Sequence, residues 1–365
     1  MTREPKPLAD SRRDQMLALL REGGSARVAD LAATLDVTPV TIRRDLELLE
    51  AEGFVERIHG GARPLDLPVP SAPSEPAPAS RLEGQIAMLV PGLDFYWPAV
   101  ARSAEAEAKS VGLRLLLRGD SYESVDERPT LAPLFESEDV RGVLAVPNVY
   151  GEHAGEVMDW ITRQRVPCVL MEREAVAPAT GLPLESVASD HALGAELAVR
   201  HLAGLGHGRI GLVVSRKSPT THKIHCGFEK AMAELGLLGS GVDAAIPDTR
   251  TVGFAAAIEG VIDETVATGT TALLVHSDRE AMGLVQQLER RGLAVPRDLS
   301  VVAYDDEVAG MFTPALTAVR PARRALGTAG VRLLVERLVD PGRPVHRVLI
   351  SPEVHVRESS AALTS

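Results

Sequence analysis

Residues 37–62 read VTPVTIRRDLELLEAEGFVERIHGGA, and no other stretch says more about this chain. Thr38 is a suitable N-cap residue, and Pro39 then falls at the first helical position. Proline has no backbone N–H, and at this position an N–H would have no partner within the helix, so proline costs nothing there. The letters FVERIHGG that follow end in a glycine pair, which predicts a short hairpin. The segment therefore predicts a capped helix followed by a small β-wing.

The predicted helix has two different faces. Ile42, Leu46 and Leu49 recur at helical spacing and are expected to pack inward. Val40, Thr41 and Arg44 project from roughly the opposite face, with Arg43 to the side. Short side chains beside an arginine suit the base edges of DNA, and a second arginine suits phosphate. In the hairpin, Arg57, His59 and Arg63 are expected near a nucleic-acid backbone.

Two shorter helices are expected ahead of this segment, at residues 11–21 and 26–35. Residues 1–63 hold ten Lys/Arg and eleven Asp/Glu, so any contact with DNA must come from local clustering of charge. An ordinary three-helix module with solvated charges is the alternative. The order of helix, turn, capped helix and wing favours a DNA-binding unit.

The run TIRRDL followed by HGG resembles the DeoR-type winged helix-turn-helix of bacterial transcription regulators, over about residues 11–62. In that family this helix is the recognition helix. The resemblance implies that Thr38, Pro39, Thr41, Arg43 and Arg44 lie in or beside the major groove. Most DeoR-type regulators continue into a sugar-phosphate sensor with an isomerase-like fold. The acidic-Gly and Lys-Thr-His signatures of that sensor are missing here, so a different sensor is expected.

The segment PLDLPVPSAPSEPAPAS at residues 64–80 marks the clearest boundary in the chain. A sequence so rich in proline forms neither a helix nor a central strand, and it predicts an extended, semi-rigid linker. The predicted organisation is a DNA-binding domain at 1–63, a linker at 64–83 and a larger domain at 84–365.

Short apolar runs alternate with helical stretches throughout the larger domain. The runs are QIAMLV, LRLLL, GVLAV, VPCVLM, RIGLVV, TALLV and LSVVAY. Uniformly apolar strands between helices predict parallel sheets covered on both faces. There are too many such strand–helix units for a single sheet, so we expect an α/β fold with two stacked subdomains.

Aromatic and polar residues gather after the expected strands, where ligands of open α/β sheets bind. Phe95, Tyr96 and Trp97 follow the first strand, although aromatics make up only 3% of the chain. These rings suit stacking on a sugar or base; packing into a core is the alternative. Polar pairs follow other strands: Pro147-Asn148, Glu172-Arg173, Asp190-His191, Ser277-Asp278 and Asp305-Asp306. Together they predict a site for a polar ligand.

Three segments resemble the ligand-binding core of LacI/GalR-type repressors, which is related to periplasmic sugar-binding proteins. They read SVASDHALGAELAVRHLAGLGHGRIGLV, VHSDREAMGLVQQLERRGLAVPRDLSVVAYDD and FTPALTAVRPARRALG. The resemblance implies a type I, two-subdomain sensor with parallel sheets, a ligand clamped between the subdomains, three crossovers and a homodimer. The implied subdomains are about 84–180 with 317–345, and 181–316 with 346–360.

The resemblance also assigns ligand contacts by position. Tyr96 and Trp97 fall where the family has aromatic contacts, Ser277 where Asn is usual, and Asp305 where a ligand-binding Asp is usual. Asn148 joins these from its strand end. Ile224 occupies a position where the family commonly has an arginine, and Lys223, His225 or Arg173 is expected to substitute. The family's own helix-turn-helix and hinge helix are replaced by the winged unit and the linker.

Charge, cysteine content and the lack of long apolar segments exclude several classes of protein. The net charge of −11 argues against a protein coated in nucleic acid, and the two cysteines, Cys168 and Cys226, imply no disulfide framework. No apolar signal segment or run of ~18 apolar residues occurs, so a cytoplasmic location is expected. His222, His225 and Cys226 lack a second ligand pair for zinc. No catalytic residue, metal or cofactor is predicted.

The sequence thus predicts a transcription regulator, most simply a repressor of carbohydrate uptake or catabolism genes, with operator DNA and a small polar effector such as a sugar as partners. A dimer would place two recognition helices on a pseudo-palindrome. A cytoplasmic solute-binding module without DNA-directed regulation is the first alternative, and the winged unit argues against it. A sugar-modifying enzyme is the second, and the missing nucleotide loop and catalytic triad argue against that.

Overall fold

The computed structural model describes residues 15–16, 19–20, 25–35, 37–51, 55–58, 60–64, 82–93, 96–120, 125–216, 218–237, 239 and 241–363. Two compact units make up the chain, Met1–Pro78 and Ala79–Ser365. Most of the expected linker, most of the expected helix at 11–21, and the residues His59 and Phe95 lie outside the described residues.

The first unit combines helices with a small antiparallel sheet. Its elements are β1 (Ala26–Arg27), α2 (Val28–Thr34), α3 (Pro39–Ala51), β2 (Val55–Ile58) and β3 (Gly61–Pro64), with the strands in the order β1-β3-β2. Met16 and Leu20 are fully buried and pack with residues of α2, α3 and the wing. Ile42, Leu46 and Leu49 of α3 are at most 2% exposed, which confirms their predicted inward face.

The helix expected at residues 26–35 begins two residues later than predicted. Ala26 and Arg27 instead pair with β3, and the N–H of Val28 donates to the carbonyl of Gly60 at 3.0 Å. This pairing needs the glycine at 61, because a Cβ there would lie 2.2 Å from the carbonyl oxygen of Ala26. A long-range strand pairing therefore overrides the local helical pattern.

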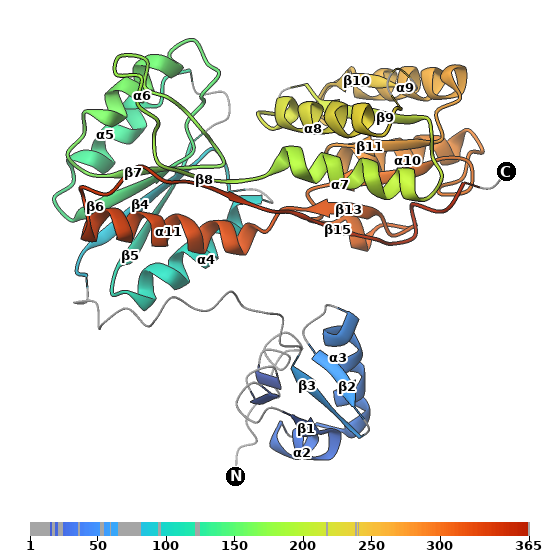
Figure 1. Ribbon diagram of the computed structural model, residues 1–365, viewed down its shortest axis with the longest axis horizontal. Coiled ribbons are helices and arrows are strands. Elements are labelled where there is room, and N and C mark those ends of the chain that lie inside the picture. The colour runs from blue at the N-terminus through green and yellow to red at the C-terminus, as the bar shows by residue number, and fades with distance from the viewer. Residues whose placement is uncertain are drawn as a thin grey trace. The chain divides into compact units, whose positions relative to one another are not determined.

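The second unit consists of two α/β lobes (Figure 1). The first lobe contains β4 (Gln85–Val90), α4 (Tyr96–Ser110), β5 (Arg114–Gly119), α5 (Arg128–Glu136), β6 (Val140–Ala145), α6 (Ala154–Thr162), β7 (Cys168–Met171), β8 (Ser186–Ser189), α11 (Arg323–Val339) and β14 (Arg347–Ile350). Its strands have the order β14-β8-β7-β6-β4-β5, and all neighbours are parallel.

The second lobe is built in the same way. It contains α7 (His191–Gly204), β9 (Ile210–Ser215), α8 (Thr221–Glu234), β10 (Asp243–Ile246), α9 (Phe254–Thr268), β11 (Ala272–Val275), α10 (Asp278–Arg290), β12 (Ser300–Tyr304), the 3-10 turn η1 (Ala309–Met311), β13 (Thr317–Arg320) and β15 (Glu353–His355). The strand order is β10-β9-β11-β12-β13-β15, with only β15 antiparallel to its neighbour.

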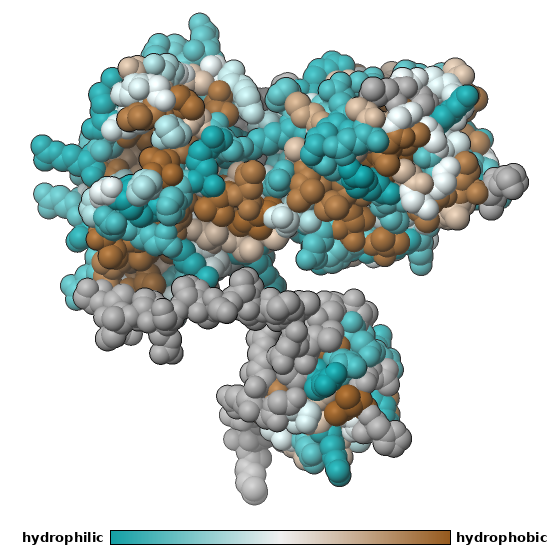
Figure 2. All heavy atoms as spheres, viewed as in Figure 1, coloured by the Kyte–Doolittle hydropathy of each residue, from teal (hydrophilic) through white to brown (hydrophobic). Residues whose placement is uncertain are grey.

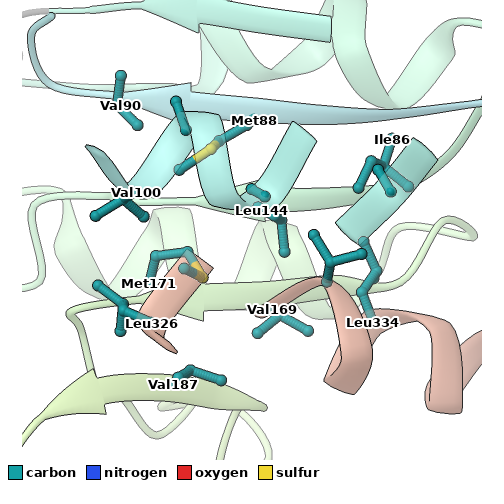
Figure 3. Close-up of a cluster of buried hydrophobic side chains, with 14 of the residues drawn as sticks. Ile86, Met88, Val90, Val100, Leu144, Val169, Met171, Val187, Leu326 and Leu334 are labelled. Carbon is teal, nitrogen blue, oxygen red and sulfur yellow. The ribbon is translucent and has the colours of Figure 1, made fainter. Parts of the chain in front are cut away.

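Helices cover both faces of each sheet, which explains the uniformly apolar strands. In the first lobe α4 and α11 cover one face, where Leu326 and Leu334 belong to the same buried cluster as Met88, Leu144 and Val169 (Figure 3). Residues of α5 and α6 pack on the opposite face. In the second lobe, α9 and α10 cover one face and α7 and α8 the other.

The chain crosses between the lobes three times, the number that the resemblance to LacI/GalR-type repressors implied. The crossings run from β8 to α7, from β13 to α11 and from β14 to β15. The predicted positions of the crossings differ from the observed ones. β8 and β14 belong to the first sheet and β13 to the second, so each crossing comes later in the chain than expected. The physical reason is hydrogen bonding between strands. β8 pairs with β7 and β14 and so stays in the first sheet, and β13 pairs with β12 and so stays in the second.

The surface of the second unit mixes hydrophilic and hydrophobic residues on both lobes (Figure 2). Exposed apolar side chains include Val339, Val345 and Leu349 near the end of α11 and in β14. Among the described residues, no helix combines the length and the apolar character that crossing a membrane requires.

Candidate functional site

A cleft between the two lobes contains two adjoining chambers. The larger chamber has a volume of about 840 Å³ and the smaller about 550 Å³. They share the lining residues Pro91, Asp120, Arg173, Arg216, Ser218 and Pro219. Both lobes contribute the carboxyl ends of parallel strands to these walls, which is where α/β sheets bind ligands.

On the first-lobe side of the larger chamber, the carboxylate of Glu172 organises its neighbours. It accepts hydrogen bonds from the hydroxyl of Tyr96, from the backbone N–H of Ser189 at 2.9 Å and from the Ser189 hydroxyl at 2.6 Å. Nε2 of His191 lies 3.3 Å from the same carboxylate. Burial by itself would raise the pKa of Glu172, but His191, Ser189 and Tyr96 lower it to about 2. Glu172 is therefore an ionised hydrogen-bond acceptor in the lining of the larger chamber.

The two aromatic residues at the start of α4 differ in their surroundings. Tyr96 is partly buried and lines the larger chamber, and burial together with the charge of Glu172 raises its pKa well above the ordinary value. It therefore remains a neutral hydroxyl. Trp97 also lines the chamber but is only 2% exposed and belongs to the first-lobe core. Its ring packs edge-on against Tyr96, with centroids 5.3 Å apart.

On the second-lobe side, the start of α10 is built from a capping box. The hydroxyl and the N–H of Ser277 donate to the carboxylate of Glu280 at 2.6 and 3.0 Å. The next residue, Asp278, accepts four backbone N–H groups, from residues 306–309, at 2.6 to 3.2 Å. Burial raises the pKa of Asp278 to about 6, although these hydrogen bonds oppose the rise. Asp278 thus fixes the turn that follows β12.

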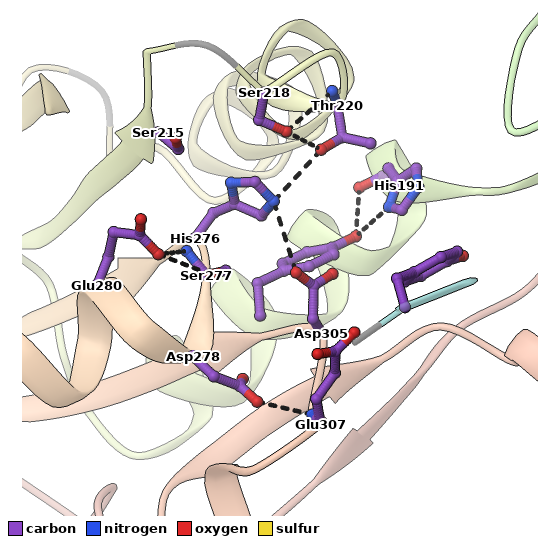
Figure 4. Close-up of polar contacts among 12 residues, drawn as sticks. His191, Ser215, Ser218, Thr220, His276, Ser277, Asp278, Glu280, Asp305 and Glu307 are labelled. Carbon is purple, nitrogen blue, oxygen red and sulfur yellow. Dashed lines mark hydrogen bonds and ion pairs between the residues drawn. The ribbon is translucent and has the colours of Figure 1, made fainter. Parts of the chain in front are cut away.

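That turn carries two carboxyl groups into the larger chamber (Figure 4). Asp305 has a positive φ of 94°, and its Oδ2 lies 3.9 Å from Nε2 of His276. Burial raises the pKa of Asp305 to about 6, and burial plus the charge of Asp305 raises the pKa of Glu307 to about 7. Burial lowers the pKa of His276 to about 4, and its Nε2 lies 3.3 Å from the Thr220 hydroxyl. The wall is therefore rich in acceptors for hydroxyl groups.

The structure brings most of the predicted ligand residues to the cleft. Tyr96, Trp97, Ser277 and Asp305 line the larger chamber, Asn148 and His225 line the smaller one, and Arg173 lines both. Nε and NH1 of Arg173 donate to the backbone carbonyls of Pro147 and Glu172. The hydroxyl of Ser277 is engaged in the helix cap.

Lys223 is the exception. It lines neither chamber, and its Nζ lies 2.7 Å from the carboxylate of Glu174, which follows β7 in the first lobe. Arg347 of β14 binds the same carboxylate. Lys223 therefore takes part in an ion pair between the two lobes.

Several lining residues were absent from the sequence prediction: His276, Glu307, Thr220, Arg216 and Tyr150. His276 directly follows β11 and precedes the predicted Ser277, so the strand-end pattern contained the signal for it. Glu307 and Thr220 lie in turns whose course depends on other elements. No local pattern marks them.

In the first unit, Thr38 caps α3 as predicted. Its Oγ1 accepts the N–H of Thr41 at 3.3 Å, and the two hydroxyls are 2.9 Å apart. Arg43 and Arg44 are exposed, and Val40 is 70% exposed. The predicted outer face of the helix is therefore open to solvent within this unit.

The structure places only some of the predicted wing residues. Arg63 of β3 forms an exposed ion pair with Glu56 of β2 at 2.6 Å. Arg57 lies in β2, while its side chain and all of His59 fall outside the described part of the structure.

Two protein-family descriptions match separate parts of the chain. Residues 12–66 match the DeoR-like helix-turn-helix domain, and residues 199–360 match the periplasmic binding protein-like domain.

Curated relatives from Streptomyces match nearly the whole chain. An uncharacterised HTH-type transcriptional regulator in the aml 5′ region of Streptomyces limosus is 33% identical over 358 residues, covering 93% of this chain and 97% of that protein. The HTH-type transcriptional regulator MalR of Streptomyces coelicolor is 29% identical over 362 residues, with the same coverage.

Solved structures resemble the second unit. A LacI family transcriptional regulator from Enterococcus faecium with bound ribose has a TM-score of 0.62 and 22% identity, covering 77% of this chain and 100% of that one. A regulatory protein of the LacI family from Chloroflexus aggregans has a TM-score of 0.65 and 21% identity, covering 76% and 98%. At this level of identity, the likeness concerns the fold.

Proposed function

This chain belongs to the HTH-type transcriptional regulators, with a DeoR-like helix-turn-helix domain joined to a periplasmic-binding-protein-like domain, and from that premise we propose that a sugar controls it. The proposed role is repression of carbohydrate uptake or catabolism genes. The observation that carries the proposal is the cleft between the lobes, whose acceptor-rich wall and aromatic Tyr96 suit a ligand with many hydroxyl groups. The ribose held by the E. faecium neighbour supports the same class of ligand.

The proposed DNA contact is made by the outer face of α3. Thr38, Pro39 and Thr41 provide short side chains at the start of this helix, and Arg44 provides a bidentate donor for a guanine edge. Arg43, with Arg57 and His59 of the wing, is assigned to phosphates. Residues near the N-terminus of a recognition helix are the ones that reach base edges in helix-turn-helix proteins.

A homodimer is proposed because two copies of α3 would read the two halves of a pseudo-palindromic operator. Ligand binding would draw the lobes together around the sugar and change the spacing of the two readers. A decisive shift between such states requires about 5.5 kcal/mol of differential affinity. Hydrogen bonds from several sugar hydroxyls to both walls are a sufficient source, since each contributes about 0.5–1.5 kcal/mol.

The proposal is tested with the full chain and fluorescein-labelled DNA from upstream of its own gene and the neighbouring genes. Fluorescence anisotropy should detect tight binding to one such fragment, and at least one member of a panel of sugars should change that affinity by tenfold or more (about 1.4 kcal/mol). Equal operator affinity with and without every sugar in the panel would overturn the proposed control by sugar.

Two variants separate the reader from the sensor. Arg44→Ala should abolish operator binding and leave sugar affinity intact. Arg165→Ala removes an exposed arginine of the second unit and should leave both unchanged. If Arg44→Ala binds the operator normally, the assignment of α3 is wrong. If sugar binds but no DNA is recognised, the chain acts as a solute-binding module without DNA-directed regulation.

A further inference from the structure

We propose that the effector is an oligosaccharide of two or more rings, with one ring in the larger chamber and the next in the smaller chamber against Tyr150. This inference rests on the proposed function and specifies the size of the ligand in the same cleft. It follows from the space in the cleft and from the side chains of the smaller chamber.

The cleft is larger than one sugar ring requires. Each chamber lies within the range of about 300–1,000 Å³ that typically holds a complete small ligand. The two chambers meet at a junction lined by Asp120, Arg173, Arg216 and Ser218, which line both of them. A single pentose or hexose ring fills part of one chamber and leaves the other to water.

Tyr150 is the aromatic residue of the smaller chamber. It follows β6 and is 61% exposed. Within the part of the chain that the structure describes, its ring stacks on no other aromatic side chain and its hydroxyl has no hydrogen-bond partner. An exposed ring at the edge of a polar chamber suits stacking on the apolar C–H face of a sugar.

Two hydrogen bonds fix the turn that carries Tyr150. The side-chain oxygen of Asn148 accepts the N–H of Tyr150 at 3.0 Å, and the N–H of Asn148 donates to the carboxylate of Glu127 at 2.8 Å. Glu127 is only 5% exposed. Because a local side-chain bond and a buried carboxylate fix this turn, the ring is presented before any ligand arrives.

The second lobe provides hydrogen-bonding groups in the same chamber. Thr221, His222 and His225 lie in the first turns of α8 and line it. Nε2 of His225 lies 2.9 Å from the carboxylate of Asp243, which orients the imidazole. The Thr221 hydroxyl donates to the carbonyl of Ser215 and keeps its oxygen as an acceptor, and the His222 imidazole can donate and accept, so this wall suits the hydroxyls of a neutral sugar ring.

The test is isothermal titration calorimetry on the full chain, with ribose, glucose and galactose against a panel of di- and trisaccharides. At least one oligosaccharide should bind about tenfold or more tightly than each of its component monosaccharides, because it adds stacking and burial in the smaller chamber. Tyr150→Ala should remove most of that gain and leave monosaccharide affinity unchanged, whereas Tyr150→Phe should retain it.

Leu182→Ala serves as the matched control, since Leu182 is an exposed residue of the first lobe, 62% accessible, that lines neither chamber. If a monosaccharide binds as tightly as every oligosaccharide, or if Tyr150→Ala binds the oligosaccharide normally, the two-ring inference is overturned and the sugar-controlled repressor stands. If no sugar binds while the operator is still recognised, the proposed effector class fails as well.

Discussion

The guanidinium carbon of Arg323 lies 5.7 Å from the centre of the Tyr96 ring, so a residue at the start of α11 contacts an aromatic wall of the cleft. The same guanidinium donates to the backbone carbonyls of Asp305 and Asp306, to the second of these at 3.1 Å. Both of these residues have positive φ values, of 94° and 49°. Arg323 therefore holds a strained turn of the second lobe against the first lobe, at the second crossing of the chain.

Replacing Arg323 should weaken ligand binding without touching the DNA reader. In Arg323→Ala, the turn loses two hydrogen bonds to a charged donor, and Asp305 loses its fixed position in the larger chamber. We expect sugar affinity to fall about tenfold or more, while operator affinity without sugar stays the same. Calorimetry and fluorescence anisotropy measure the two quantities. Arg324→Ala changes the exposed neighbour and is the control.

The ion pair between Lys223 and Glu174 predicts a coupling between the lobes. The two side chains are 22% and 23% exposed, and the pair is formed at 2.7 Å. Partial exposure screens it, so a double-mutant cycle of Lys223→Met and Glu174→Gln should give a coupling of about 0.5–1 kcal/mol in urea unfolding. Zero coupling would show that the pair contributes nothing to the joining of the lobes.

The same two variants test whether Lys223 contacts the ligand, as the sequence predicts. A residue that only links the lobes should change sugar affinity to a similar extent as its partner. A large loss of affinity in Lys223→Met with none in Glu174→Gln would instead place Lys223 on the ligand.

Ligand affinity should increase with pH between about 5 and 8, because Asp305 and Glu307 ionise in this interval, with pKa values of about 6 and 7. A carboxylate accepts a hydroxyl's hydrogen bond more strongly than a protonated carboxyl group does. At pH 5 about a tenth of Asp305 and about a hundredth of Glu307 are ionised, so affinity at pH 5 should be at least about tenfold lower than at pH 8. Asp305→Asn should make the profile measured by calorimetry less steep and leave the titration of Glu307.

The raised pKa values also predict how the stability of the ligand-free second unit changes with pH. In the folded chain Asp278 and Asp305 bind protons up to about pH 6, whereas in the unfolded chain they release them near their ordinary value of about 3.8. The unfolded state therefore binds fewer protons between these values, and these groups lower stability as the pH rises from about 4 to 6. Thermal unfolding across this range, with Asp305→Asn as the comparison, measures their contribution.

Gly61 should be essential to the wing, and Gly60 less so. A Cβ at 61 would lie 2.2 Å from the carbonyl oxygen of Ala26, whereas a Cβ at 60 meets nothing within 4 Å. Gly60 has a φ of 80°, so Gly60→Ala should cost only about 1 kcal/mol of strain. Gly61→Ala should separate β1 from β3 and strongly reduce operator binding. Sugar affinity, measured by calorimetry, should be unchanged in both variants.

The sequence alone predicted the elements whose cause is local. Thr38 and Pro39 mark the start of α3, and the spacing of Ile42, Leu46 and Leu49 identifies the buried face of that helix. The apolar runs between helices predicted parallel sheets in two lobes, because a strand covered on both faces has no polar face. Most of the polar residues predicted after those strands line the cleft.

Only the tertiary structure decided which strand joins which sheet and which residues the charged side chains contact. Ala26 and Arg27 form a strand because β3 lies beside them, and β8, β13 and β14 take their lobes from pairings with distant segments. Lys223 meets Glu174 and Arg323 meets Tyr96 across separations of 49 and 227 residues in the chain. Such contacts depend on hydrogen bonding and packing between elements that are remote in sequence, and no local pattern of residues records them.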